Sequence, residues 1–280
     1  MKCSVCHIEV PASARLCPSC QGDVGFPNVR AAETPEEKNA LAIRLKDAYT
    51  STAARGCTNV LEEFGRALLA SKPVICRSLE IVCGLVSADN QLYISFHKQV
   101  AAGSRLPKDD QWENGRPAVE ATLFPHYYQD INVACLTLNN RGLTNYGAYS
   151  VVLKNLMISN RTSLFEENPF IFMRKHHVIA GDPIPLGYRA PWDSRREFAM
   201  AKLHSKIDKD TKAQDFPSIL LLPGIDNASD EYIEAHIYGQ IHPSSFERIC
   251  GPKPTKKSDL VLWKSLQTKC NNLGIILEES

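Results

Sequence analysis

Hydrophobic and polar residues alternate most regularly in residues 230–239 of this chain. One face of the predicted strand is polar and carries Tyr232, Glu234, His236 and Tyr238. The intervening positions are apolar, as in a strand that buries one face. A carboxylate between a tyrosine and a histidine fits either a solvated surface strand or the floor of a cleft.

Further periodic segments predict a mixture of helices and strands. Thr34 and Pro35 begin a helix after a linker, and residues 34–70 are predicted as two helices. Strands are predicted at 72–76, 92–97, 131–138, 146–154, 161–165 and 218–222. Helices are predicted from residue 193, at 243–249 and at 257–272. Residues 98–130 are irregular but rich in aromatic side chains, which predicts an ordered loop.

Four of the ten cysteines lie within the first twenty residues, in a pattern typical of a metal site. The two pairs, Cys3 with Cys6 and Cys17 with Cys20, can each present two thiolates to one tetrahedral Zn²⁺. So short a segment cannot bury a core, and the metal would supply its folding free energy. We therefore predict a structural zinc ribbon in residues 1–30. The other six cysteines are interpreted mainly as buried, reduced thiols.

Composition indicates the cellular location of the protein but does not identify its binding partner. The hydrophobic content of 44% is ordinary for a soluble globular protein. No apolar run approaches the roughly 18 residues that a membrane span needs, and the start of the chain lacks the apolar segment of a signal peptide. We therefore expect a cytoplasmic protein without a membrane partner. A formal net charge of +1 neither demands nor excludes a nucleic-acid partner.

Two motifs resemble a known superfamily. Tyr232-x-Glu234 and the alternating residues after it resemble the last motif of ADP-ribosyltransferases, in which a glutamate opens a core strand. Residues 146–154, running on to 161–168, are similar to the strands before the catalytic glutamate in bacterial toxin-like members. Over roughly residues 72 to 250, the chain resembles in particular the toxin components of bacterial toxin–antitoxin or phage-defence systems.

The resemblance implies an α+β fold in which helices surround a split, strongly curved β-sheet. This domain would occupy residues 31–280 and follow the zinc ribbon. Its expected parts are a helical lead-in at 34–70, a core at 72–250 and a C-terminal helix at 257–272.

The resemblance also implies roles for particular side chains. Glu234 is the expected catalytic residue. Arg77, at the exit of the first core strand, is expected to hold the phosphates of NAD, because a planar guanidinium forks onto phosphate oxygens. Ser163 is expected to orient Glu234, although the family's Ser-Thr-Ser pattern is absent here. Ser95 is the alternative residue for this role.

Three further side chains are implied as NAD contacts. His97 is one, because a rival class of the superfamily uses histidine and tyrosine with the glutamate. Tyr146 is expected to stack on nicotinamide, and Tyr232 belongs to the last motif. Neither the Walker pattern nor the dinucleotide fingerprint is present, so a Rossmann fold would not bind this NAD.

The implied reaction cleaves the bond between nicotinamide and ribose in NAD. ADP-ribose then passes to a macromolecular acceptor, which can be a protein or RNA or DNA. An antitoxin or chaperone is a further expected partner. The alternative hypothesis is a non-catalytic zinc-ribbon adaptor that binds nucleic acid or protein. In that case the strand of Glu234 is scaffold.

Overall fold

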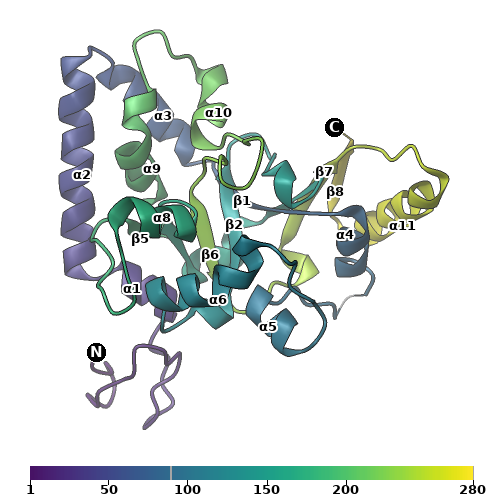
Figure 1. Cartoon of the computed structure of the whole chain (residues 1–280), viewed down its shortest axis with the longest axis horizontal. Helices are drawn as coiled ribbons and strands as arrows, with labels where there is room; N and C mark the ends of the chain where they lie inside the picture. Colours follow the sequence, from purple (N-terminus) through teal and green to yellow (C-terminus); the bar gives the residue numbers. More distant parts are fainter. Residues whose placement is uncertain (89, 280) are drawn as a thin grey trace.

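The computed structural model describes residues 1–88 and 90–279, and its centre is one eight-stranded mixed sheet (Figure 1). The order across the sheet is β5-β4-β6-β2-β1-β3-β7-β8. Neighbouring strands are antiparallel except for the parallel pair β7 and β8. The strands are β1 (Lys72–Arg77), β2 (Ile131–Thr137), β3 (Tyr149–Leu153), β4 (Thr162–Phe165), β5 (Arg189–Pro191), β6 (Glu234–Tyr238), β7 (Phe246–Gly251) and β8 (Ile276–Glu279).

Helices cover both faces of this sheet, which confirms the predicted α+β class. They are α1 (Pro27–Ala32), α2 (Pro35–Ala54), α3 (Thr58–Leu68), α4 (Leu79–Leu85), α5 (Phe96–Ala101), α6 (Gln111–Leu123), α7 (Asn155–Ile158), α8 (Pro169–His176), α9 (Arg195–Leu203), α10 (Phe216–Leu220) and α11 (Lys257–Leu273). Helices α2, α3 and α9 pack together at one end of the molecule, and α4 packs on α11 at the other (Figure 1).

The two faces of the sheet bury different side chains. Ile75, Leu136 and Ile237 belong to the main hydrophobic core, which also takes in side chains of α3, α9 and α11. The opposite face, which carries Glu234 and His236, lies against a smaller aromatic cluster from the end of α6, from β4 and from α8. The alternation predicted for β6 thus separates an apolar face from a polar one.

The sheet opens between β1 and β2. Strand β1 pairs with β2 only over Lys72–Val74, and its second half pairs with β3 over Val74–Arg77. Strand β2 continues beside β6 over Ile131–Cys135. The facing halves of β1 and β2 are therefore not paired with each other. Residues 72–74 still join both parts, so the strands form one continuous sheet with an opening.

The predicted strand at 92–97 is wrong. Tyr93 makes only an isolated bridge with Ile241, and helix α5 begins at Phe96. The cause is the hydroxyl of Ser95, which accepts a hydrogen bond from the backbone N–H of Lys98 at 3.3 Å and caps this helix. Tyr93, Ser95 and His97 consequently do not share one strand face.

Three other predictions of secondary structure also fail. The segment 98–130 contains α6, whose first turn is capped by the carboxylate of Asp110. The predicted strand at 218–222 overlaps α10, which has Pro217 in its first turn. The predicted helix at 243–249 is a short 3₁₀ turn, Pro243–Ser245, followed by β7. The C-terminal helix predicted at 257–272 is confirmed as α11.

Gly147 fixes the approach of the segment before β3 to the end of β1. Its φ is +143°, and a Cβ built there would lie 2.1 Å from the carbonyl carbon of Arg77. We expect Gly147→Ala to lower the free energy of unfolding by about 1–3 kcal/mol, because backbone would have to shift. Urea unfolding measures this change.

Gly84→Ala is the matched control. Gly84 lies within α4, and no atom lies within 4 Å of the added Cβ. This change should raise the free energy of unfolding by about 0.5–1 kcal/mol, through helix propensity alone. Equal effects at both glycines would contradict the close approach at Gly147.

Candidate functional site

A cavity of about 830 Å³ lies at the opening between β1 and β2. Arg77, Tyr93, Tyr146, Tyr232 and Glu234 all line it. Two of these residues, Arg77 and Glu234, are brought to one cavity from far apart in the sequence. By alternation from Val74, which pairs with Cys135, Arg77 belongs to the sheet face opposite Glu234. Both reach the cavity because the sheet is open here.

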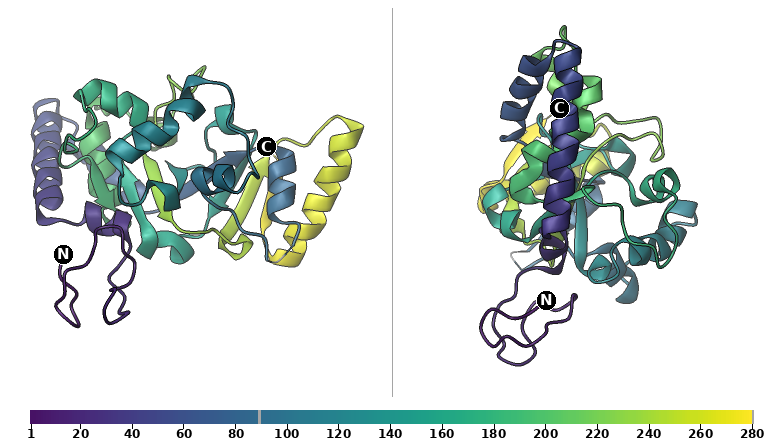
Figure 2. Two further views of the ribbon diagram at one scale, coloured as in Figure 1. Left: turned by 60° about the horizontal axis from the view of Figure 1, so that its bottom comes forward. Right: turned by 90° about the vertical axis from the view of Figure 1, so that its left-hand side faces the viewer.

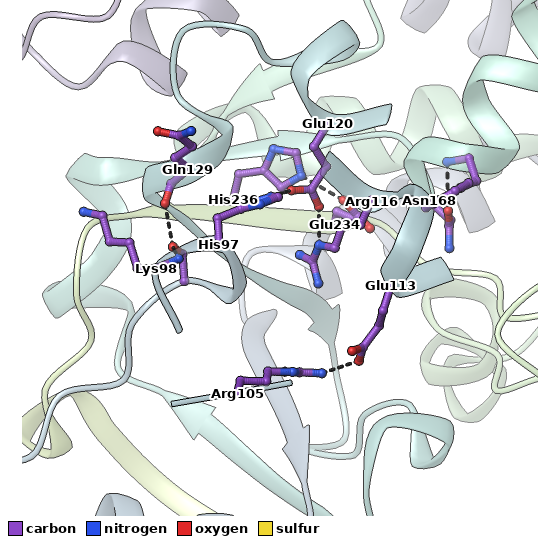
Figure 3. A network of polar contacts seen from close by, with 12 residues as sticks. His97, Lys98, Arg105, Glu113, Arg116, Glu120, Gln129, Asn168, Glu234 and His236 are labelled. Carbon is purple, nitrogen blue, oxygen red and sulfur yellow. Dashed lines mark hydrogen bonds and ion pairs between the residues drawn. The ribbon is translucent and has the colours of Figure 1, made fainter. Parts of the chain in front are cut away.

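The carboxylate of Glu234 is buried and held by two neighbours on its own strand segment. The hydroxyl of Tyr232 donates a hydrogen bond to Oε1 at 3.1 Å. Nε2 of His236 lies 2.8 Å from Oε2 (Figure 3). Residues two apart on a strand share a face, so the local sequence itself places both partners. Each oxygen of the carboxylate therefore has a fixed partner.

Tyr146 extends this hydrogen-bonded chain to the surface. Its hydroxyl hydrogen bonds to that of Tyr232, while 40% of the Tyr146 residue is exposed. Burial of the hydroxyl and the nearby charge of Glu234 raise the pKa of Tyr146 to about 12. The same two causes raise the pKa of Tyr232. Both phenols are therefore neutral and able to donate hydrogen bonds at neutral pH.

Arg77 stands apart from the other arginines of the cavity. Its guanidinium donates to the backbone carbonyl of Cys76 at 2.5 Å and to the hydroxyl of Tyr93. Within residues 1–88 and 90–279, it has no carboxylate partner. Arg105 and Arg116, by contrast, pair with glutamates of α6. The charge of Arg77 is therefore available to an anion.

A second polar network, from α5 and α6, forms another wall of the cavity (Figure 3). Nε2 of His97 lies 2.6 Å from Oε2 of Glu120, and Nε of Arg116 lies 2.7 Å from Oε1. Burial opposes the charge of Glu120, but Arg116 and His97 together outweigh burial and lower the pKa of this carboxyl. His97 thus contacts Glu120 instead of Glu234. Arg116 and Glu120 were not predicted as site residues, although their spacing of four residues is a helical signal.

Neither predicted serine contacts Glu234. The hydroxyl of Ser163 lies opposite His236 across β4 and β6, and it accepts a hydrogen bond from Nδ2 of Asn28 at 3.1 Å. Ser95 caps α5 and donates to the carbonyl of Gln129 at 2.5 Å. The orienting positions beside Glu234 belong to Tyr232 and His236. His236 was missed as a site residue, although the alternation placed it on the same face.

The four N-terminal cysteines form a cluster that fits a structural metal ion such as zinc. Their sulfur atoms all lie within 4.8 Å of one another, with Cys3 and Cys20 at 3.6 Å and Cys6 and Cys17 at 3.5 Å. Sulfur atoms around tetrahedral Zn²⁺ are separated by about 3.8 Å. Backbone N–H groups of Cys20 and Ser19 lower the pKa of Cys17 to about 6, whereas the side chain of Cys6 and burial raise the pKa of Cys20 to about 12.

The two halves of the ribbon repeat one local structure. Each half is a small hairpin, closed by a bridge between Lys2 and Glu9 or between Leu16 and Asp23. His7 and Gln21 occupy the same place in the two hairpins, four residues after a cysteine, and both have positive φ. This shared turn brings each cysteine pair to one side of its hairpin.

Helix α1 fastens the ribbon to the sheet (Figure 2). Arg30 donates to backbone carbonyls of the ribbon, including those of Ala12 at 2.6 Å and Ala14 at 2.7 Å. Asn28 is fully buried, and its Nδ2 donates to the backbone carbonyl of His236 at 2.8 Å. The ribbon is therefore connected through one short helix to the strand that carries Glu234.

Known proteins give no indication of the function of this chain, so a function can be inferred only from the site. No model of a known protein family matches this sequence, and no curated protein matches it. In the described part of the chain, none of the helices has both the length and the apolar character required to cross a membrane.

We predict that the protein binds one Zn²⁺ through Cys3, Cys6, Cys17 and Cys20. Metal analysis of freshly purified, reduced protein should find about one equivalent, because four thiolates close a tetrahedral site. Cys17→Ser should reduce the content below about half an equivalent. Cys83→Ser, a change of a half-buried thiol outside the cluster, should leave it unchanged. A wild-type content below about half an equivalent would refute the site.

Proposed function

We propose that this chain is an NAD-dependent ADP-ribosyltransferase, which cleaves the nicotinamide–ribose bond and transfers ADP-ribose to a macromolecular acceptor. The observation that carries the proposal is that Glu234 and Arg77 line the same cavity. The carboxylate of Glu234 is held by two hydrogen bonds, and Arg77 has no carboxylate partner among the described residues. The cavity volume falls within the range of about 300–1,000 Å³ that is usual for small-molecule sites.

Glu234 supplies the charge that bond cleavage needs. When the C–N bond breaks, its electron pair leaves with nicotinamide and the ribose becomes oxocarbenium-like. A carboxylate beside this carbon stabilises the positive charge, and most effectively when its orientation is fixed before the reaction. The hydrogen bonds from Tyr232 and His236 support such an orientation for Glu234. The acceptor then bonds to the ribose carbon and loses its proton to Glu234 or to solvent.

Arg77 and Tyr146 have the complementary roles of holding the substrate. The diphosphate of NAD is an anion, and Arg77 can offer it two parallel N–H donors. The exposed ring of Tyr146 lies on the cavity wall and offers a flat surface to the nicotinamide ring. The acceptor is a protein or a nucleic acid, and a toxin component would carry out this reaction against cellular targets.

We expect Glu234→Gln to lower ADP-ribose transfer by about 10²- to 10³-fold, because the variant keeps size and hydrogen bonding but loses the charge. NAD affinity should change little, since that charge acts mainly in the transition state. The assay uses labelled NAD with whole-cell protein and RNA fractions, which also identifies the acceptor class.

Glu247→Gln is the matched control for this change. Glu247 pairs with Lys72 and is not among the cavity-lining residues, so transfer should remain close to wild type. If the folded Glu234→Gln protein also kept near wild-type transfer, Glu234 would not be catalytic. The non-catalytic adaptor would then become the better explanation.

Arg77→Ala should weaken NAD binding by about 10- to 100-fold, the range expected from losing about 1.5–3 kcal/mol of charged hydrogen bonding. Arg77→Lys should restore binding only in part, because an ammonium lacks the planar fork. Isothermal titration calorimetry measures the dissociation constant. Arg66→Ala serves as control, since Arg66 is exposed on α3 away from the cavity. Unchanged affinity in Arg77→Ala would remove Arg77 from the site.

A further inference from the structure

We propose that His236 is a positioning residue, whose imidazole holds Glu234 in its reactive orientation. This inference rests on the proposed function. His236 is almost completely buried, and its Nε2 lies 2.8 Å from Oε2 of Glu234. An ionised carboxylate can only accept hydrogen bonds, so the imidazole must be the donor. The bond therefore requires a proton on Nε2.

The surroundings of His236 prevent its ring from turning away. The ring of Phe124 stands edge-on at a centroid distance of 4.7 Å, and the ring of Phe165 is stacked at 5.8 Å. Phe124 directly follows the last residue of α6 and Phe165 lies on β4, so two separate elements enclose the imidazole. Such an aromatic enclosure would suit an apolar side chain better, because a buried polar group costs free energy unless it is hydrogen-bonded.

The backbone of His236 is fixed as well. Its carbonyl accepts the bond from Nδ2 of Asn28, and the same amide also donates to the hydroxyl of Ser163. The side chain and the main chain of His236 are thus both held, so the direction of its Nε2–H bond is defined. Tyr232 defines the other oxygen of Glu234. Without His236, one oxygen would be released and the carboxylate could rotate from the ribose.

Two variants of similar size separate positioning from packing. The amide nitrogen of glutamine in His236→Gln can occupy the place of Nε2 and donate to Glu234. His236→Leu fills the aromatic enclosure but cannot donate. We expect His236→Leu to lose about 10²-fold in turnover, the cost of a misplaced reacting group. His236→Gln should recover most of it, and KM for NAD should stay near wild type in both.

Comparing the folding stability of the two variants with their turnover tests the alternative, a purely structural role. In a purely structural role, activity would follow folding stability, and the apolar leucine should be at least as stable as glutamine in this enclosure. A more active but less stable His236→Gln protein therefore supports positioning. Turnover that follows the stability measured in urea, with the leucine variant equal to or above the glutamine variant, overturns it.

A spectroscopic measurement separates this inference from the proposed function. Long-range ¹H–¹⁵N correlation spectra of the full wild-type chain should show His236 protonated at Nε2, and Glu234→Leu should alter that signal. An unprotonated Nε2 overturns the positioning role even if NAD is turned over. No NAD turnover in the wild type overturns the proposed reaction and the catalytic part of this inference. The spectrum then shows by itself whether the His236–Glu234 bond exists.

Discussion

The structure depends on how strand β1 pairs with its two neighbours, β2 and β3. These two strands diverge, so β1 does not pair with both along its whole length, and its pairing changes at Val74. Strand β1 pairs with β2 up to and including Val74, and from Val74 on it pairs with β3. The cavity exists because the two strands part, and side chains from both faces of the sheet line it. The tight contact of Gly147 with the backbone of Arg77 holds the end of β1 on the β3 side. The position of the candidate site is therefore set by strand pairing, and the helices α5 and α6 form the remaining walls of the cavity.

Two of the three arginines that line the cavity are paired with carboxylates. Glutamates of α6 pair with Arg105 and Arg116, and Glu234 is bonded to a histidine and a tyrosine. Buried charges are costly unless they are paired, so the two ion pairs offset the cost of burying these side chains. Arg77 has no such carboxylate partner in the described part of the chain, so a bound anion would pair with its charge. Arg116 and Glu120 line the cavity as an ion pair, and His97 contacts Glu120 without lining the cavity itself.

The sequence allowed the strand of Glu234 and the cysteine cluster to be predicted, because both are local patterns. Alternation alone placed Tyr232, Glu234 and His236 on one face. Helix α6 was missed because Gly115 and Pro117 interrupt its pattern. The structure gives a reason for the glycine, since a Cβ there would lie 2.8 Å from the ring of Phe170. The strand wrongly predicted at 92–97 shows that one capping serine can outweigh six residues of alternation. The catalytic and NAD-binding roles of the site residues remain predictions.

The bond between Asn28 and His236 joins residues that are 208 positions apart. During synthesis the ribbon and α1 emerge first, and local contacts form earlier than distant ones. The surface that receives Asn28 consists of Arg161, Ser163 and His236, so it is complete only after β6 has been made. The ribbon can therefore close around its metal long before it has a place to dock. Docking of α1 becomes a late step of folding, and it coincides with the arrival of the strand that carries Glu234.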